Sequence, residues 1–234
     1  MIKLGVIYGG KSTEHDISIK SAKSILKNLN KEKYEIYPIY IEKNGDWYER
    51  ESNKIENIIE YLKKLDIVFP VLHGLGGEDG TIQGMLELFN IKYVGCKVLA
   101  SSVGMDKAFA KIIFEKAKIN QTKYLYIKKI KENEYIYVNE NLDEIKYNMN
   151  ELVNLVEEKI KYPIFVKPSN SGSSVGVNKA ENREEIVYSI KEAEKFDTKV
   201  LIEEGIIGKE VECAVLGNNK GELMVSNVRR NSIC

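Results

Sequence analysis

The stretch FVKPSNSGSSVGV, residues 165–177, sets an apolar strand against a loop of small polar residues. The strand delivers Lys167 at its end, and residues 169–174 then offer hydroxyls and closely spaced backbone N–H groups. Gly172 and Gly176 permit the backbone conformations in which such N–H groups surround an anion. A serine-rich surface turn has a similar composition. Because Lys167 adds a positive charge beside the loop, we predict a local anion site here.

The composition limits the class of protein. The chain has 234 residues, of which 43% are hydrophobic, enough for one large or two modest domains. Its 35 basic and 35 acidic side chains cancel, so no global field attracts nucleic acid or a membrane surface. The three cysteines are widely spaced, which argues against a disulfide framework or a zinc site. No apolar run reaches membrane-spanning length, and we expect a cytoplasmic protein without nucleic-acid or membrane partners.

Hydrophobic periodicity predicts two kinds of architecture on either side of residue 97. The first part alternates strands and helices, which gives a parallel sheet covered by helices. The second part is a mixed α+β unit, in which residues 139–150 are the least structured. The expected strands are 2–8, 34–41, 65–73, 92–95, 123–127, 134–138, 163–167, 199–203, 210–216 and 222–228, and the expected helices are 16–29, 53–64, 81–89, 105–117, 148–159 and 182–195.

A second phosphate-binding pattern lies near the N-terminus. Gly5, Gly10, Lys11 and Ser12 match the P-loop pattern GxxxxGK[ST] letter for letter. A phosphate loop needs its first glycine at the end of the strand, whereas three strand-forming residues follow Gly5 here. We therefore keep a P-loop NTPase only as an alternative. We expect Gly9 and Gly10 to form a tight turn at the carboxyl end of the first strand, where ligands meet open α/β sheets.

Glu14 and His73 are candidate residues at the rim of the predicted parallel sheet. Glu14 opens the first helix, where a carboxylate also stabilises the helix dipole without any ligand. The segment LHGLGGEDGTIQG, residues 72–84, places five glycines around His73 at the end of another parallel strand. Glycines let backbone approach a ligand, although a flexible turn before a helix is the alternative. Since both residues are expected at one rim, we predict a functional site that contains them.

Charged residues elsewhere suggest further contacts. Lys107, in MDKAFAK, lies near a helix start, where its charge opposes the helix dipole and a bound anion would compensate. A solvated helix face is the alternative. The segment VLIEEGIIGKEVECAVLG, residues 200–217, places Glu203 and Glu204 at a strand end and Glu210 at the start of the next strand. These carboxylates either face solvent in a hairpin or hydrogen-bond a ribose or a base amino group.

Five motifs occur in order along nearly the whole chain: GGKSTEHDIS, HGLGGEDGTIQG, GMDKAFAK, YPIFVKPSNSGSSVGV and LIEEGIIGKEVECAVLG. Together they resemble the D-alanine–D-alanine ligases of the ATP-grasp superfamily. The resemblance implies an α/β and α+β fold with a Rossmann-like N-terminal substrate domain (1–97), a central subdomain with a phosphate-covering loop (98–202) and the beginning of a C-terminal ATP-grasp domain (203–234). It also implies ATP-dependent ligation of two D-alanines through an acyl phosphate, for peptidoglycan precursors, with Mg²⁺ as cofactor and a homodimeric enzyme.

The resemblance also implies roles for individual residues. Glu14 resembles the carboxylate that holds the ammonium group of the first D-alanine, and His73 resembles the nearby substrate-site histidine. Lys107 and Lys167 match the lysines on the ATP phosphates. Ser173 matches the loop serine that hydrogen-bonds to the Glu14 equivalent, so Glu14 and Ser173 are the implied catalytic pair. The rest of the implied ATP site is the loop residue Ser174, the adenine- and ribose-binding carboxylates Glu203 and Glu210, and the hinge residues Glu204 and Ile206.

The sequence departs from the family after ELMVSN, residues 222–227. The family continues for several dozen residues, which supply a mobile substrate loop, an arginine at the transferring phosphate and the ligands of two Mg²⁺ ions. We therefore predict no metal ligand in this chain and negligible turnover by residues 1–234 alone. Two alternatives stay open: a non-catalytic nucleotide-binding fragment of such a ligase, and ligation of D-alanine to D-lactate.

Overall fold

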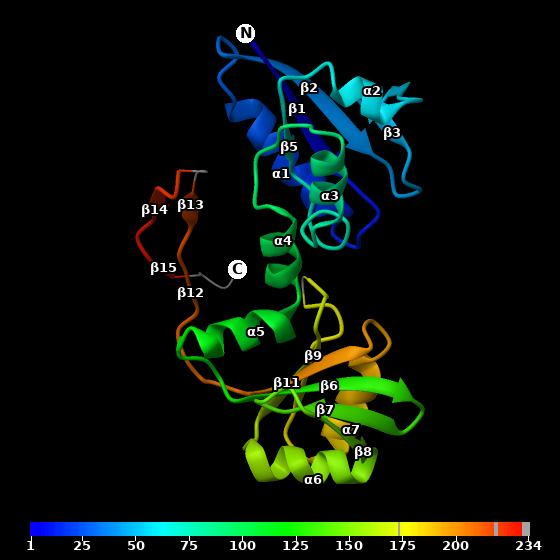
Figure 1. The fold of residues 1–234 in the computed structure, drawn as a ribbon, viewed down its shortest axis with the longest axis vertical. Helices are drawn as coiled ribbons and strands as arrows, with labels where there is room; N and C mark the ends of the chain where they lie inside the picture. The colour runs from blue at the N-terminus through cyan, green and yellow to red at the C-terminus, as the bar shows by residue number, and fades with distance from the viewer. Residues whose placement is uncertain (173, 218–219, 231–234) are drawn as a thin grey trace. The chain divides into compact units, whose positions relative to one another are not determined.

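The computed structural model describes residues 1–172, 174–217 and 220–230. The chain divides into a first compact unit, Met1–Glu204, and a second unit that begins at Gly205. The first unit contains two sheets, each with its own helices (Figure 1). Within the part of the chain described, no helix is long and apolar enough to span a membrane.

The N-terminal part of the first unit is built on a five-stranded sheet. Its strands are β1 (Ile2–Gly9), β2 (Tyr34–Ile41), β3 (Trp47–Glu49), β4 (Asn53–Lys54) and β5 (Ile67–Pro70), in the order β4-β3-β2-β1-β5. β1 pairs in parallel with both β2 and β5, as the predicted β-α-β connections require. β3 and β4 extend the β2 edge as an antiparallel hairpin.

Helices cover both faces of this sheet. They are α1 (His15–Asn28), α2 (Ile58–Leu62) and α3 (Thr81–Leu88). α1 packs on one face, where Val6 and Ala22 are fully buried. α2 and α3 contribute Leu62 and Leu86 to the opposite face, against Ile7. Because β1 is covered on both faces, it is a nearly continuous apolar run rather than an alternating one.

The course of β1 excludes a P-loop. The strand continues through Gly5 to Gly9, and a Cβ atom on Gly5 would lie 2.7 Å from Cδ1 of Leu65. The first glycine of the pattern is therefore packed inside a central strand, and the P-loop alternative is wrong. The turn is formed by Gly9 and Gly10 as predicted, with φ angles of +91° and +98°. A Cβ atom on Gly9 would overlap the carbonyl oxygen of Ile41, so only glycine fits there.

The second sheet of the first unit has six strands. They are β6 (Tyr124–Lys131), β7 (Glu134–Val138), β8 (Glu144–Asn148), β9 (Ile164–Pro168), β10 (Asn178–Ala180) and β11 (Lys199–Glu204), in the order β10-β9-β11-β6-β7-β8. The remaining helices are α4 (Val98–Met105), α5 (Lys107–Lys116), α6 (Met149–Lys159) and α7 (Arg183–Ala193). β9 lies between β10 and β11, and these pairs are antiparallel. This part of the unit is the mixed α+β structure predicted from the sequence.

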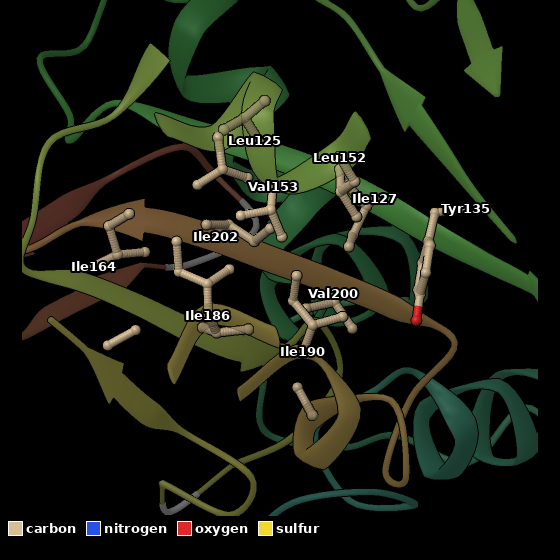
Figure 2. Close-up of a cluster of buried hydrophobic side chains, with 14 of the residues drawn as sticks. Leu125, Ile127, Tyr135, Leu152, Val153, Ile164, Ile186, Ile190, Val200 and Ile202 are labelled. Carbon is tan, nitrogen blue, oxygen red and sulfur yellow. The ribbon is translucent and has the colours of Figure 1, made fainter. Parts of the chain in front are cut away.

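Opposite faces of the six-stranded sheet have different partners. On one face α6 and α7 bury a core that Figure 2 shows as a cluster of aliphatic side chains, among them Leu152, Ile190 and Ile202. On the other face Ala108 of α5 packs with Leu201. Successive strand residues point to opposite faces, so the odd-numbered residues of β9 and β11 lie on the α5 face.

Several sequence-based boundaries are wrong. The predicted helix over 53–64 is only the five-residue α2, because Asn57 caps it by accepting a bond from the Glu60 N–H at 3.2 Å. The predicted strand over 92–95 is reduced to a bridge between Val68 and Tyr93. Residues 139–150, expected to be the least structured, contain β8, and Asn148 caps α6 with a capping box. Neither α4 nor the β3–β4 hairpin was predicted.

The second unit consists of short antiparallel pairs. Its strands are β12 (Val211–Glu212), β13 (Val215–Gly217), β14 (Leu223–Val225) and β15 (Arg229–Arg230). β12 pairs with β15, and β13 pairs with β14. The strand predicted over 210–216 is thus divided into β12 and β13, and the strand predicted over 222–228 is reduced to β14.

Candidate functional site

Two lysines pair with one buried carboxylate on the α5 face of the six-stranded sheet, and α5 carries a third lysine one turn away. Lys107 and Lys111 lie one turn apart on α5, Lys167 lies on β9 and Glu203 on β11. Glu203 Oε1 is 2.6 Å from Lys111 Nζ, and Glu203 Oε2 pairs with Lys167. Burial raises the pKa of Glu203, but hydrogen bonds from Lys111 and Lys167 outweigh it and leave that pKa below its usual value. Glu203 is therefore ionised at neutral pH.

Lys107 is held close to the polar loop. Its Nζ donates to the carbonyl oxygen of Ser171 and lies 3.5 Å from that of Ser169. Burial lowers the pKa of Lys107, and the positive charge of Lys167 lowers it further. Two cations that repel each other at a partly desolvated surface would be relieved by an anion placed against both. The phosphate-binding role of Lys107 and Lys167 stays a prediction.

Hydrogen bonds anchor the first two residues of the polar loop, Ser169 and Asn170. Ser169 is fully buried, and its Oγ accepts a bond from the Ala108 N–H at 3.1 Å. The Asn170 side chain donates to Asp197 Oδ2 at 2.7 Å. Gly176 has a φ of +73°, in the left-handed region that the sequence analysis expected of a glycine in this loop, and Ser174 also lies there, with a φ of +60°. Ser173, predicted to be catalytic, lies outside the described residues.

Asp106 joins this loop to α5 and β11. Its Oδ1 accepts bonds from the Ser169 hydroxyl at 2.5 Å and from the Phe109 N–H at 3.2 Å, so Asp106 is the N-cap of α5. Its other oxygen pairs with Lys199. Burial raises the pKa of Asp106, but the bonds from Lys199 and Ser169 outweigh it and hold that pKa below 3.8. The sequence analysis missed Asp106, although an aspartate directly before a helix is a recognisable capping signal.

Glu14 and His73 lie at the carboxyl ends of β1 and β5, where the sequence places them. The Ser12 hydroxyl donates to the His73 carbonyl oxygen at 2.7 Å and accepts a bond from the Glu14 N–H at 3.1 Å. Below it, the buried Ser18 hydroxyl donates to the Val71 carbonyl oxygen at 2.6 Å. The His73 ring is 3.0 Å from the Ser21 hydroxyl. Serine side chains thus fix the spacing between the two loops.

Glu14 also lines a cavity together with the polar loop. This cavity has a volume of about 270 Å³ and is bounded by Glu14, Leu75 and Gly172. A Cβ atom on Gly172 would lie 2.5 Å from Oε2 of Glu14, so the loop backbone approaches the carboxylate closely. His73 instead lines a neighbouring cavity of about 300 Å³, which shares Leu75 with the first. The structure therefore brings Glu14 to the loop predicted to cover phosphates.

The remaining predicted site residues are Glu204, Ile206 and Glu210. Glu204 ends β11, and its N–H donates to the Lys123 carbonyl oxygen at 3.0 Å. Ile206 and Glu210 are exposed residues of the second unit, and their roles stay predictions. Residues 1–172, 174–217 and 220–230 contain no group of three or more His, Cys, Asp or Glu that could hold a metal. No residue is assigned to Mg²⁺.

Comparison with known families and proteins identifies relatives along the whole chain. Residues 3–62 and 50–96 match the family model "D-ala D-ala ligase N-terminus", and residues 113–232 match "D-ala D-ala ligase C-terminus". A D-alanine–D-alanine ligase of Acetivibrio thermocellus is 46% identical over 92% of this chain and 64% of its own length. The corresponding ligase of Clostridium novyi is 40% identical over 96% of this chain. The chain spans 64% and 68% of the lengths of these two relatives.

Solved structures similar to this chain are also those of ligases. The VanG D-Ala:D-Ser ligase of Enterococcus faecalis matches with a TM-score of 0.81 at 35% identity, over 98% of this chain and 69% of that protein. A D-alanine–D-alanine ligase of Bacillus anthracis, complexed with ATP, matches with a TM-score of 0.69 at 30% identity, over 93% of this chain and 62% of that protein. The fold class predicted from the sequence is thereby confirmed.

Proposed function

Since this chain belongs to the D-alanine–D-alanine ligase family, we propose that it serves the ATP-dependent joining of two D-alanines, a step in peptidoglycan precursor synthesis. The observation that carries the proposal is the cationic pair Lys107 and Lys167 beneath a polar loop whose backbone also approaches Glu14. One end of this arrangement suits a triphosphate, and the other suits an ammonium group. The same loop serves both.

On the nucleotide side, Lys107 and Lys167 would hold the ATP phosphates. Within the described residues the Lys107 ammonium hydrogen-bonds to carbonyl oxygens and forms no ion pair with a carboxylate. The carboxylate oxygen of the first D-alanine attacks the γ-phosphorus, the bond to the β–γ bridging oxygen breaks, and ADP leaves. The two lysines stabilise the negative charge that develops on the transferring group. Mg²⁺, when bound, would neutralise further phosphate charge.

On the substrate side, Glu14 would hold the ammonium group of the first D-alanine. The amine of the second D-alanine then attacks the acyl phosphate carbon, a proton leaves the nitrogen, and inorganic phosphate departs. Because water would also attack an acyl phosphate, a cover over the reaction is needed, and we propose that the polar loop, which is anchored through Ser169 and Asn170, provides it. Binding both amino acids and ATP at one place replaces a three-body encounter in solution.

The test begins with binding, which depends on the site residues alone. Calorimetric titration should show ATP binding to the purified chain and D-alanine binding that Glu14→Gln abolishes. In the presence of Mg²⁺, ADP and D-alanyl-D-alanine are then measured by chromatography. Because negligible turnover is predicted for residues 1–234 alone, the binding data decide: a chain that does not bind ATP, or D-alanine binding that survives Glu14→Gln, would contradict the proposal.

The second amino acid is tested separately, because the Enterococcus faecalis relative is a D-Ala:D-Ser ligase. Because negligible turnover is predicted for this chain, D-alanine, D-serine and D-lactate are titrated one at a time into the chain with bound ATP, and their dissociation constants are compared. We propose D-alanine as the preferred acceptor. The cytoplasmic location and the homodimer expected from the sequence remain predictions.

Ser12→Ala is expected to weaken D-alanine binding about fivefold. The hydroxyl joins the backbone of Glu14 to that of His73, and losing one such hydrogen-bonded link costs about 1 kcal/mol. The dissociation constant for D-alanine is compared with that of Ser24→Ala, an exposed serine on α1. Equal constants in the two variants would show that Ser12 does not position the substrate loops.

A further inference from the structure

We infer that Lys111, which has no assigned role, is a positioning residue of the nucleotide site. It holds the ionised Glu203 carboxylate in place and balances its charge when Lys167 turns to a phosphate. The inference rests on the proposed function, because it needs an anionic nucleotide at Lys167. It assigns to Lys111 a task distinct from phosphate binding.

The two oxygens of Glu203 have different partners. Lys111 Nζ is 2.6 Å from Oε1, whereas Lys167 pairs with Oε2. Lys167 can therefore leave without disturbing the bond to Lys111. Thr122 strengthens the bond between Lys111 and Glu203, since its hydroxyl is 3.0 Å from Lys111 Nζ and 3.4 Å from Oε1 of Glu203.

Lys111 is also the more firmly held of the two lysines. Its ammonium lies 5.0 Å from the centre of the Tyr124 ring, in addition to its bonds with Glu203 and Thr122. Only 13% of its side chain is exposed, against 24% for Lys167. In the described part of the chain, Glu203 is the one ion-pair partner of Lys167. Lys167 is thus the mobile cation of the pair and Lys111 the fixed one.

Charge balance explains why a fixed cation is needed. The Glu203 side chain is 9% exposed, and a buried carboxylate without a counter-ion is strongly destabilising. A triphosphate that took Lys167 would leave Glu203 in that state if Lys111 were absent. Glu203 would then retain Lys167, and the nucleotide would have to compete with this carboxylate for the lysine. With Lys111 in place, Glu203 stays ionised and Oε2 becomes available as a hydrogen-bond acceptor.

The role that the family resemblance implies for Glu203, contact with adenine, makes its charge matter for the choice of base. A free, ionised carboxylate oxygen accepts a bond from the exocyclic amino group of adenine, whereas a base that presents a carbonyl oxygen there is repelled. A site built to pair with a donor rejects analogues that lack it more strongly than an apolar pocket does. Lys111 should therefore influence the discrimination between ATP and GTP and not only affinity.

The experiment measures ATP and GTP dissociation constants for the whole chain and for Lys111→Met, which keeps the length of the side chain without its charge. We expect ATP to bind about tenfold more weakly to Lys111→Met, with GTP changed much less. Lys111→Arg should restore most of the ATP affinity and the ATP preference. Lys116→Met, an exposed lysine on the same helix, is the matched control.

Thr122→Val provides a second variant in the same network, with a smaller loss in the same direction, should Lys111→Met fold poorly. Unchanged ATP binding by Lys111→Met, or an equal loss for ATP and GTP, would overturn the inference while leaving the proposed function intact. A wild-type chain that binds neither nucleotide would overturn both.

Discussion

Replacing Asp106 with alanine is expected to lower the free energy of unfolding by about 3–5 kcal/mol, the range found when one partner of a buried ion pair is removed. The substitution leaves Lys199 without its counter-ion and the buried Ser169 hydroxyl without its acceptor. It also removes the N-cap bond to Phe109 at the start of α5. The effect should appear as a lower urea midpoint by circular dichroism.

The matched control for Asp106 is Asn148→Ala, which removes an exposed N-cap from α6. Its side chain accepts one bond, from the Glu151 N–H at 3.0 Å, so a loss of about 1 kcal/mol is expected. If Asp106→Ala cost no more than this, the ion pair and the bond to Ser169 would contribute nothing measurable.

The contribution of the Asp106 charge to stability is tested by measuring the free energy of unfolding at different pH values. Its pKa is lowered from 3.8 in the folded protein, so the ionised form is stabilised by folding. That contribution is complete above 3.8 and is lost as the pH falls through the lowered value. Asp106→Asn should therefore be less stable than wild type at neutral pH, and the two should converge in strong acid. A constant difference at all pH values would exclude the electrostatic explanation.

Lys167→Ala is expected to weaken ATP binding by about 10- to 100-fold, because a charge-assisted bond to phosphate contributes about 1.5–3 kcal/mol. Lys11→Ala should change ATP affinity less than about twofold, since Lys11 follows the Gly9–Gly10 turn and does not belong to a phosphate loop. Both constants are measured by the same titration. A large loss of ATP affinity for Lys11→Ala with none for Lys167→Ala would show that the phosphates bind near Lys11, which would contradict the proposed site.

The parallel sheet was predictable because its signals are local. Apolar runs define β1, β2 and β5, and Gly9 and Gly10 mark the turn after β1. The failures occurred where the local pattern was weak. β8 has an exposed, charged sequence, and pairing with β7 rather than its own pattern makes it a strand. β3 and β4 are too short for periodicity to detect.

Some residues of the candidate site were predictable from the sequence and others were not. Lys107 and Lys167 belong to recognisable motifs, and the structure joins the start of α5 to the end of β9 through the bond from the Lys107 N–H to the Ser169 carbonyl oxygen at 3.0 Å. Lys199 was invisible because its partner, Asp106, is 93 positions away and the pair depends on the position of α5 over β11. Lys111 sits in the motif GMDKAFAK, yet its role emerges only when β11 brings Glu203 opposite it. Sequence motifs identify ligand-binding residues more readily than the residues that hold them.

The alternation of side chains along β11 limits how this protein can evolve. Val200 and Ile202 pack in the core beneath α6 and α7, while Leu201 and Glu203 face α5. Inserting or deleting a single residue within the strand would exchange these faces for every residue beyond it. Glu203 would enter the apolar core, and an aliphatic side chain would meet Lys111. Homologous strands should therefore vary in composition while keeping a constant length between Lys199 and Glu203.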